Sequence, residues 1–324
     1  MNDPELAGKL GVGRTTVTAI RRRFERSGMV SYHLLPDFAR AGCELLTTLY
    51  GEFSGAAVRD LDVLRESLRD GVGSAFYMVR FGGQHLSFGA AESLTRVREG
   101  IIAHHRAHHE SGYLTDRRHN YVFFPLKLTQ LPRFFDYAPL VAERFGLKHS
   151  VAAEPKPAAG VWRPSRKELS TFNALVSLPG GSDEAIAKIA KVSRQTVNSL
   201  RNRFLGEGLL KPVRIPDVKR LGYGLLAFTH LHMSPHVGLD GRRKHTESVL
   251  ADAAHVLKIA GDLETVLLSY HADYGAFRKS QERLLEVYKR DNMLSDEPVV
   301  KLFPLSETEN ILNHDYSNIV PGTV

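Results

Sequence analysis

Apolar residues recur at spacings of three and four in three successive runs of the stretch 163–222. This pattern predicts a first helix over 167–178, a second helix capped by Ser182 or Asp183, and a third capped by Ser193. A seryl hydroxyl at such a position accepts a hydrogen bond from a free N–H group of the first helical turn. The buried stripe of the third helix comprises Val197, Leu200 and Phe204.

The order helix, helix, tight turn, helix is that of a helix-turn-helix, whose third helix lies in the major groove of DNA. Arginine bridges guanine, asparagine and glutamine bridge adenine, and hydroxyls and lysines hold phosphate. We therefore predict a DNA-reading face on this module, followed by a wing hairpin over 209–215. Its predicted contact residues are Lys188, Lys191, Ser193, Arg194, Gln195, Thr196, Asn198, Arg201, Asn202, Arg203 and Arg214.

An internal repeat relates the two ends of the chain. Residues 6–42 align without gaps with residues 186–222 at an offset of 180, and a Phe-Pro-Leu tripeptide recurs at 124–126 and 303–305. Identity at this density predicts a tandem duplication of one unit. Identical pairs include Arg14 and Arg194, Thr16 and Thr196, Phe24 and Phe204, and Gly42 and Gly222.

The first copy of the module repeats the reading face over a buried stripe of Val17, Ile20 and Phe24. At the offset of 180 its first helix falls before Met1, so the helix that covers the core is missing. Either the chain start is truncated, or this copy is degenerate, or another segment covers Val17 and Phe24. Its predicted DNA contacts are Arg14, Thr15, Thr16, Thr18, Arg21 and Arg22.

The segment after each module alternates between strand and helix patterns in the ferredoxin-like order β-α-β-β-α-β. In the first half we expect strands over 44–53, 75–81, 84–90 and 121–126, and helices over 57–70 and 92–110. In the second half we expect strands over 223–233, 256–260, 264–270 and 299–305, and helices over 244–254 and 273–289. The expected fold class is therefore α+β, with two winged helix-turn-helix modules, each followed by a ferredoxin-like domain.

Several segments resemble the Lrp/AsnC (feast/famine) family of transcription regulators. Residues 5–17, Glu-Leu-Ala-Gly-Lys-Leu-Gly-Val-Gly-Arg-Thr-Thr-Val, resemble its helix-turn-helix signature, and residues 217–223 resemble the lead into its first strand. Gly261-Asp262 before an apolar strand resembles the Gly-Asp turn near the family's effector site. The resemblance implies that Gly261 and Asp262 bind an effector. It also implies that the two halves pair within the chain, as family dimers do, or that whole chains form a homodimer.

The pattern and the resemblance together divide the chain into five parts. An Ala-, Pro- and Gly-rich stretch without apolar periodicity reads as a linker between the halves. The parts are a winged helix-turn-helix without its first helix (1–42), a ferredoxin-like domain (43–145), the linker (146–162), a complete winged helix-turn-helix (163–222) and a second ferredoxin-like domain (223–324).

Positive charge is concentrated in the two predicted DNA-binding modules. The whole chain has a net charge of +7. Residues 163–222 hold twelve Lys/Arg against five Asp/Glu, and residues 1–42 hold seven against four. The rest of the chain is therefore slightly acidic, which is the distribution expected of a protein that meets DNA through these modules.

Two groups of histidines suggest other chemistry. His104, His105, His108 and His109 on the expected helix form two i,i+4 pairs, a spacing that lets two imidazoles face one metal ion. Further ligands are not evident in the sequence, so a polar helix end is the simpler interpretation and no metal site is assigned. His230 and His232 alternate along a strand and are interpreted as ordinary sheet positions.

The expected function is a sequence-specific, DNA-binding transcription regulator of the cytoplasm, modulated by a small molecule at the paired α+β domains. Its expected partners are double-stranded DNA and this effector; we expect no cofactor, membrane contact or catalytic residue, and hence no enzyme. The single cysteine, Cys43, fits a reducing cytosol. No apolar run reaches the roughly 18 residues of a membrane helix.

Two alternatives stay open. Siroheme decarboxylases resemble Lrp/AsnC proteins in fold, and some consist of paired units, so a tetrapyrrole enzyme is one alternative. The 15 histidines of this chain do not match that family's pattern in the sequence. A protein–protein adaptor with vestigial winged helices is the other alternative, and the missing first helix favours it.

Overall fold

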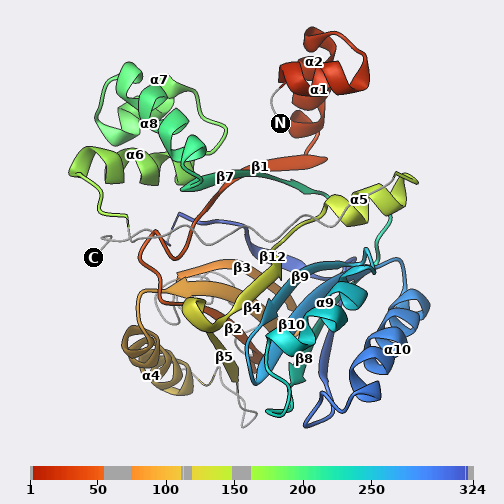
Figure 1. Ribbon diagram of the computed structural model, residues 1–324. Helices are drawn as coiled ribbons and strands as arrows, with labels where there is room; N and C mark the ends of the chain where they lie inside the picture. The colour runs from red at the N-terminus through yellow and green to blue at the C-terminus, as the bar shows by residue number, and fades with distance from the viewer. Residues whose placement is uncertain are drawn as a thin grey trace.

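The computed structural model describes residues 3–54, 74–110, 112, 119–147, 162–317 and 319. Two small helical modules lie on one side of the molecule, and two five-stranded sheets lie on the other (Figure 1). The predicted α+β fold class is confirmed. No helix among the described residues is both long enough and apolar enough to cross a membrane.

Equivalent elements follow one another in the two halves. The first half contains α1 (Asp3–Leu10), α2 (Arg14–Arg26), β1 (Val30–Pro36), β2 (Leu45–Glu52), β3 (Ser74–Phe81), β4 (Gln84–Ala91), α4 (Leu94–Glu110), β5 (Asn120–Pro125), η2 (Leu126–Leu128), β6 (Gln130–Arg133) and α5 (Ala138–Arg144). The second half contains α6 (Arg166–Ser177), α7 (Asp183–Ala190), α8 (Arg194–Gly206), β7 (Leu210–Pro216), β8 (Leu225–His232), η3 (Asp240–Arg242), α9 (Arg243–Leu250), β9 (His255–Ala260), β10 (Glu264–His271), α10 (Tyr274–Arg290), β11 (Val299–Pro304) and β12 (Glu309–Asn313). Several of these elements, among them β2 and β8, start 180 positions apart.

The two halves exchange their last strands. One sheet has the order β12-β3-β4-β2-β5 and the other has the order β11-β8-β10-β9-β6. Strand β6 of the first half therefore lies at the edge of the second sheet, and β12 of the second half lies at the edge of the first. The expected pairing within the chain is thus built from backbone hydrogen bonds as well as from side-chain packing.

A third, two-stranded sheet joins the helical modules. Strand β1 pairs with β7 in antiparallel register, from Val30 opposite Pro216 to Pro36 opposite Leu210. The wing hairpin expected over 209–215 is therefore wrong, because this stretch is a single strand whose partner lies in the other half. A local pattern of apolar residues does not distinguish a hairpin strand from a strand that pairs across 180 positions.

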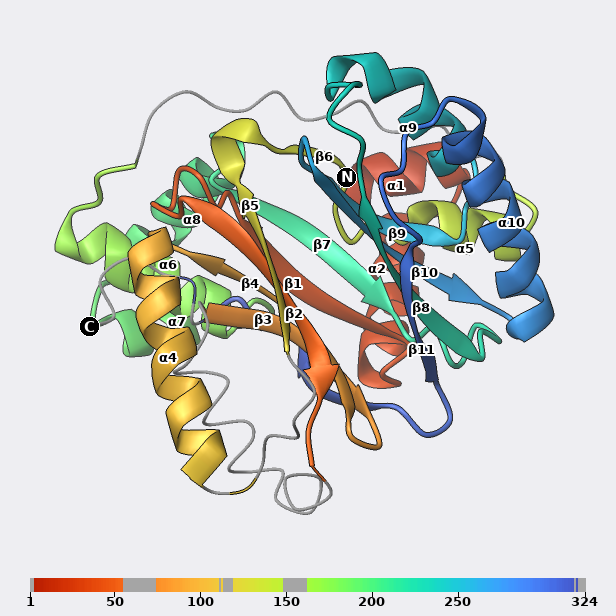
Figure 2. The same ribbon diagram turned by 90° about the horizontal axis from the view of Figure 1, so that it is seen from below.

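Helices α4, α9 and α10 cover the outer faces of the two five-stranded sheets (Figure 1). Figure 1 shows α4 on one flank, over the first sheet, and α9 and α10 on the other flank, over the second. The inner faces meet, and the ring centroids of Tyr50 and Phe228 lie 4.9 Å apart there. Figure 2 shows the strands of the two halves from below. Because each sheet is covered on both faces, β2 and β8 are buried at seven of their eight positions.

The two helical modules differ in how well their cores are covered. In the second module Phe204 is fully buried and contacts Trp162 and Phe172. In the first module Val17 is buried, but its neighbour Ile20 and the equivalent Phe24 are each 41% exposed. Helix α6 provides Phe172 in the second module, and no described helix precedes α1 in the first.

Three short elements are absent from the sequence-based prediction. Strands β6 and β12 have four and five residues, and α5 has seven. Such lengths are too short for a periodic pattern to identify. The helix expected over 57–70 and most of the expected linker, residues 148–161, lie outside the described residues.

Candidate functional site

The predicted DNA contacts occupy α2, α8 and their surroundings. In the second module, Lys188, Lys191, Ser193, Arg194, Gln195, Asn198, Asn202, Arg203 and Arg214 are exposed, and Thr196 and Arg201 are half-buried. In the first module, Arg14, Thr15, Thr16 and Arg22 are exposed, and Thr18 and Arg21 are half-buried. The predicted cap of α8 is present, since the Ser193 hydroxyl accepts from the Thr196 N–H at 3.1 Å.

Several of these side chains already have partners in the second module. Arg201 donates to the Gly181 carbonyl and forms an ion pair with Asp183 at 3.0 Å. Asn198 donates to the other carboxylate oxygen of Asp183 at 3.1 Å, and Arg203 forms an ion pair with Glu168. These three side chains must leave their partners before they contact a base or a phosphate. Arg194 and Gln195 lie in the first turn of α8 and are exposed.

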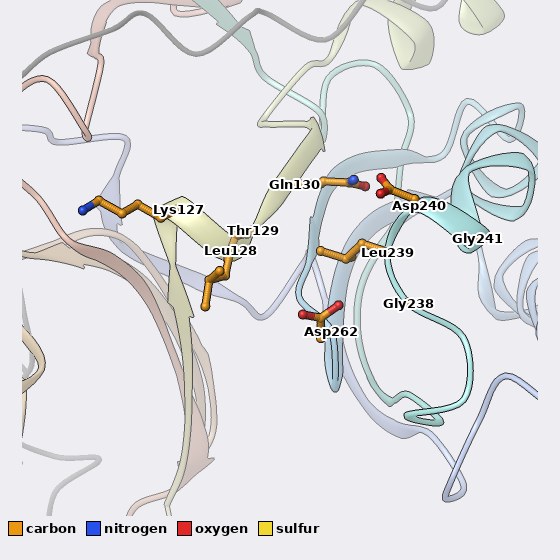
Figure 3. A pocket seen from close by; sticks show the side chains of 9 residues that line it. All are labelled: Lys127, Leu128, Thr129, Gln130, Gly238, Leu239, Asp240, Gly241 and Asp262. Atoms are coloured by element: carbon orange, nitrogen blue, oxygen red, sulfur yellow. The ribbon is translucent and has the colours of Figure 1, made fainter.

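The expected effector turn borders an open pocket between the two halves. This pocket has a volume of about 440 Å³, within the usual range for small-molecule sites. Gln130 and Asp240 point toward each other across it, whereas Lys127 points away (Figure 3). Asp262 lies at its edge, and its backbone carbonyl accepts a 2.6 Å hydrogen bond from the buried Arg242. A Cβ at Gly261 would lie 3.5 Å from the Phe124 ring of the first half.

A second group of polar side chains lies under α4, on the outer face of the first sheet. We call it the α4 histidine cluster and define it as His85 of β4, His104, His105 and His108 of α4, and His119 beside β5. All of these residues except the half-buried His105 are buried. Five imidazoles in one core region are unusual, because each ring carries polar nitrogens that need partners.

The rings of the α4 histidine cluster are packed closely around Phe53. The centroid of the Phe53 ring lies 4.2 Å from that of His85 and 4.9 Å from that of His119. The rings of His104 and His108, one helical turn apart, have centroids 4.1 Å apart. Gly51 makes this packing possible, because a Cβ there would lie 2.9 Å from the His119 ring and 3.2 Å from His85.

Hydrogen bonding within the cluster is incomplete. His105 Nε2 lies 2.8 Å from the Tyr121 hydroxyl, and His119 Nε2 donates to the Glu52 carbonyl at 3.3 Å. Both ring nitrogens of His85 and Nδ1 of His119 are buried without a hydrogen-bond partner among the described residues. An unpaired buried nitrogen costs about 1–3 kcal/mol, so a ligand that supplied a partner would recover this free energy.

Burial favours the neutral imidazole of His85, His108 and His119 in the cluster. It holds the pKa of His85 well below the usual range, and the neighbouring His119 and His104 lower it further. Burial also lowers the pKa of His119 to about 4. A neutral imidazole has a free lone pair, so these side chains suit ligation of a metal or hydrogen bonding to an anion that brings its own negative charge.

The α4 histidine cluster has no counterpart in the second half. The positions 180 residues later are occupied by Thr265, Leu284, Leu285, Tyr288 and Val299, and Met233 corresponds to Phe53. Leu284, Tyr288 and Met233 belong to one hydrophobic core region, in which the Tyr288 hydroxyl accepts a hydrogen bond from Lys258 at 2.7 Å. The chemistry of the cluster is therefore specific to the first half.

Sequence reasoning found part of the cluster and missed the rest. The i,i+4 spacing indicated His104, His105, His108 and His109, and the structure leaves His109 exposed, outside the cluster. His85 and His119 were missed, because a single histidine in a strand or loop carries no spacing signal. Only the register of β2 with β4 and β5 brings them to the helix.

Comparisons with known proteins show which solved structures have a similar fold. No model of a protein family and no curated protein matches the chain. Among solved structures, the siroheme decarboxylase NirDL in complex with an iron-uroporphyrin III analogue matches with a TM-score of 0.54 and 8% identity. The match covers 98% of this chain and 90% of that one. NirDL alone gives a TM-score of 0.55 at the same identity and coverage. An AsnC family transcriptional regulator from Agrobacterium tumefaciens matches with 13% identity and a TM-score of 0.36, over 43% of this chain and 90% of that one.

The full-length matches correct one expectation. We expected from the sequence that the protein is not an enzyme, because its segments resemble regulators. The solved structures that match nearly the whole chain are those of an enzyme, so this expectation is wrong.

Proposed function

We propose that the protein is an enzyme that binds an iron tetrapyrrole and decarboxylates it. This is the activity named for the siroheme decarboxylase whose structures match 98% of the chain. The observation that carries the proposal is the correspondence of the fold over 98% of the chain. The repeated spacing of elements further supports a tandem duplication, with a ligand site in one half that the other lacks.

The α4 histidine cluster supplies groups that suit such a substrate. Decarboxylation of an acetate side chain breaks the bond to the carboxyl carbon, releases CO₂ and leaves an electron pair on the side-chain carbon, which then takes up a proton. A carboxylate beside a neutral imidazole favours the charged form of that imidazole. Binding of the substrate would therefore draw a proton into the cluster, close to where the product needs it.

This function is tested with the purified full-length protein under reducing, anaerobic conditions. We expect added iron-uroporphyrin III to shift its visible absorption band on binding, and added siroheme to lose the mass of CO₂. Unchanged absorption together with an unchanged mass of siroheme would contradict the proposal.

Variants connect the function to the cluster. His119→Ala is expected to weaken tetrapyrrole binding at least tenfold, whereas His109→Ala, on the exposed side of the same helix, leaves it unchanged. If His119→Ala binds as tightly as the wild type, the site lies elsewhere even though the activity stands. Circular dichroism confirms that both variants are folded.

A second candidate function is binding to DNA, which the exposed basic face of α8 favours. Arg194 and Gln195 project from the first turn of this helix, beside Lys188 and Lys191, and all four are exposed. Helix N-termini and basic side chains position phosphates, and arginine reads guanine. DNA binding and catalysis do not exclude each other in a chain with both kinds of module.

Fluorescence anisotropy of labelled DNA across a salt series tests this second function. Arg194→Ala is expected to cost about 1–3 kcal/mol of binding free energy if Arg194 reads a base, or to reduce the salt slope by about one if it holds phosphate. Arg243→Ala, which removes the same charge from the distant α9, is the control. If the wild type and Arg194→Ala bind every DNA sequence with equal affinity, Arg194 of α8 does not contact DNA.

A further inference from the structure

Two histidines and a glutamate converge on the inner face of the second sheet, away from the α4 histidine cluster. His230 and His232 alternate along β8 and therefore point to the same side. Glu264 of β10 lies directly opposite His232 in the antiparallel register. One potential ligand atom from each of the three side chains lies within 4.8 Å of the others.

Two of these ligand atoms already face each other. His230 Nε2 and Glu264 Oε1 are 3.8 Å apart, and the centroids of the two imidazole rings are 4.4 Å apart. Two ligands that bind one zinc ion at about 2.1 Å with tetrahedral angles are separated by roughly 3.4 Å. A small rotation of the Glu264 side chain, which is 36% exposed, would bring the pair to this separation.

Tyr50 of the first half holds His230 in the orientation that a metal ligand needs. The Tyr50 hydroxyl lies 2.9 Å from His230 Nδ1, so this nitrogen is already engaged. The other nitrogen, Nε2, is buried without a hydrogen-bond partner among the described residues and points toward Glu264. Metal-binding histidines commonly have such a partner on the nitrogen that does not bind the metal.

The chemistry of the donor set suits a metal as well. Two imidazoles and one carboxylate are the donor set of many zinc and iron(II) sites.

The equivalent positions of the first half form no such site. At the offset of 180, Tyr50 corresponds to His230, Glu52 to His232, and Gln84 to Glu264. Gln84 donates to the Leu302 carbonyl at 2.8 Å, and Glu52 lies 3.6 Å from the ammonium group of Lys301. In the first half, Glu52 and Gln84 therefore contact the second sheet. In the second half, the equivalent His232 and Glu264 present potential ligand atoms instead.

We propose that His230, His232 and Glu264 bind a divalent first-row transition-metal ion, with Tyr50 as the positioning residue. Three protein ligands leave at least one coordination position for water or another small ligand. The metal also ties β8 to β10 and, through Tyr50, the second half to the first. This inference does not depend on the proposed tetrapyrrole function, because it uses other residues and another face of the sheets.

The test uses the full-length protein, freed of metal with a chelator, and Zn²⁺ or Co²⁺ alone. We expect one equivalent of Zn²⁺ to bind in calorimetry and to raise the unfolding temperature of the protein. Bound Co²⁺ should show visible absorption bands characteristic of nitrogen and oxygen ligands. A wild-type protein that binds neither ion would overturn the proposal.

Variants separate this site from other histidines. His232→Ala and Glu264→Gln are expected to weaken Zn²⁺ binding at least 100-fold and to abolish the rise in unfolding temperature. Tyr50→Phe keeps all three ligands and should weaken binding about 10- to 100-fold. His236→Ala, an exposed histidine on the loop after β8, is the matched control and should bind normally. Normal binding in both His232→Ala and Glu264→Gln would show that the metal binds elsewhere and would overturn the assignment.

Discussion

Glycine at position 51 determines how closely the imidazoles of the α4 histidine cluster pack. The contacts that a Cβ there would make include the His119 Cα at 3.2 Å, which a side-chain rotation does not relieve. We expect Gly51→Ala to destabilise the protein by about 1–3 kcal/mol through overpacking. Gly206→Ala is the control, since a Cβ at Gly206 meets nothing within 4 Å.

Urea unfolding of both variants measures this effect, and tetrapyrrole binding by Gly51→Ala shows whether the ring arrangement matters for function. If Gly51→Ala and the wild type have the same free energy of unfolding, β2 moves away from the His119 backbone without loss of stability. The sequence offers no sign of this constraint. Gly51 looks like any glycine in a strand, and its role depends on His85 and His119, which the register brings to it from two other strands.

The equivalent helices α2 and α8 bury their matching phenylalanines to different extents. Phe24 on α2 and Phe204 on α8 are identical residues 180 positions apart, yet Phe24 is 41% exposed and Phe204 is fully buried. We expect Phe204→Ala to cost about 3–5 kcal/mol, the usual loss for a buried phenylalanine, and Phe24→Ala to cost about 1 kcal/mol. Hydrogen exchange of the amides of α8 and α2 measures the two losses separately. A comparable loss in both helices would indicate that Phe24 has a buried partner.

Most elements of the fold were predictable, because their patterns are long and local. Helix α10 and strands β8 and β10 agree with their predicted ranges within about two residues. The pairing of β1 with β7 and the exchange of β6 and β12 were not predictable, since no residue within these short strands specifies a partner in the other half. The unpaired nitrogen of His230 likewise becomes visible only once Tyr50 is placed beside it.

Buried histidines make the whole molecule sensitive to acid. Burial lowers the pKa of His119 and of His271 to about 4, whereas an unfolded histidine titrates near 6.5. Between these pH values the unfolded chain binds more protons than the folded one, so acidification favours unfolding. The free energy of unfolding is therefore highest above pH 6.5 and falls as the pH decreases toward 4. Each histidine whose pKa is lowered from 6.5 to about 4 contributes a loss of about 3 kcal/mol.

The free energy of unfolding, measured by urea titration at several pH values from 7 to 4, checks this prediction. His271→Gln, which cannot take up the proton, should reduce the slope in this window. A free energy that is constant between pH 6.5 and 4.5 would contradict the assigned pKa values.

The exchanged strands also bear on how the chain folds as it is made. Glu309 of β12 pairs with Arg80 of β3, 229 positions earlier, through two hydrogen bonds of 3.1 Å each. A ribosome adding roughly 5–20 residues per second needs about 11–46 s to cover that distance. During this interval the edge of β3 is open to any other strand, including one from a neighbouring nascent chain. A chaperone that binds the first half during synthesis should therefore raise the yield of correctly folded protein. The same chaperone added after the chain has left the ribosome should raise it less.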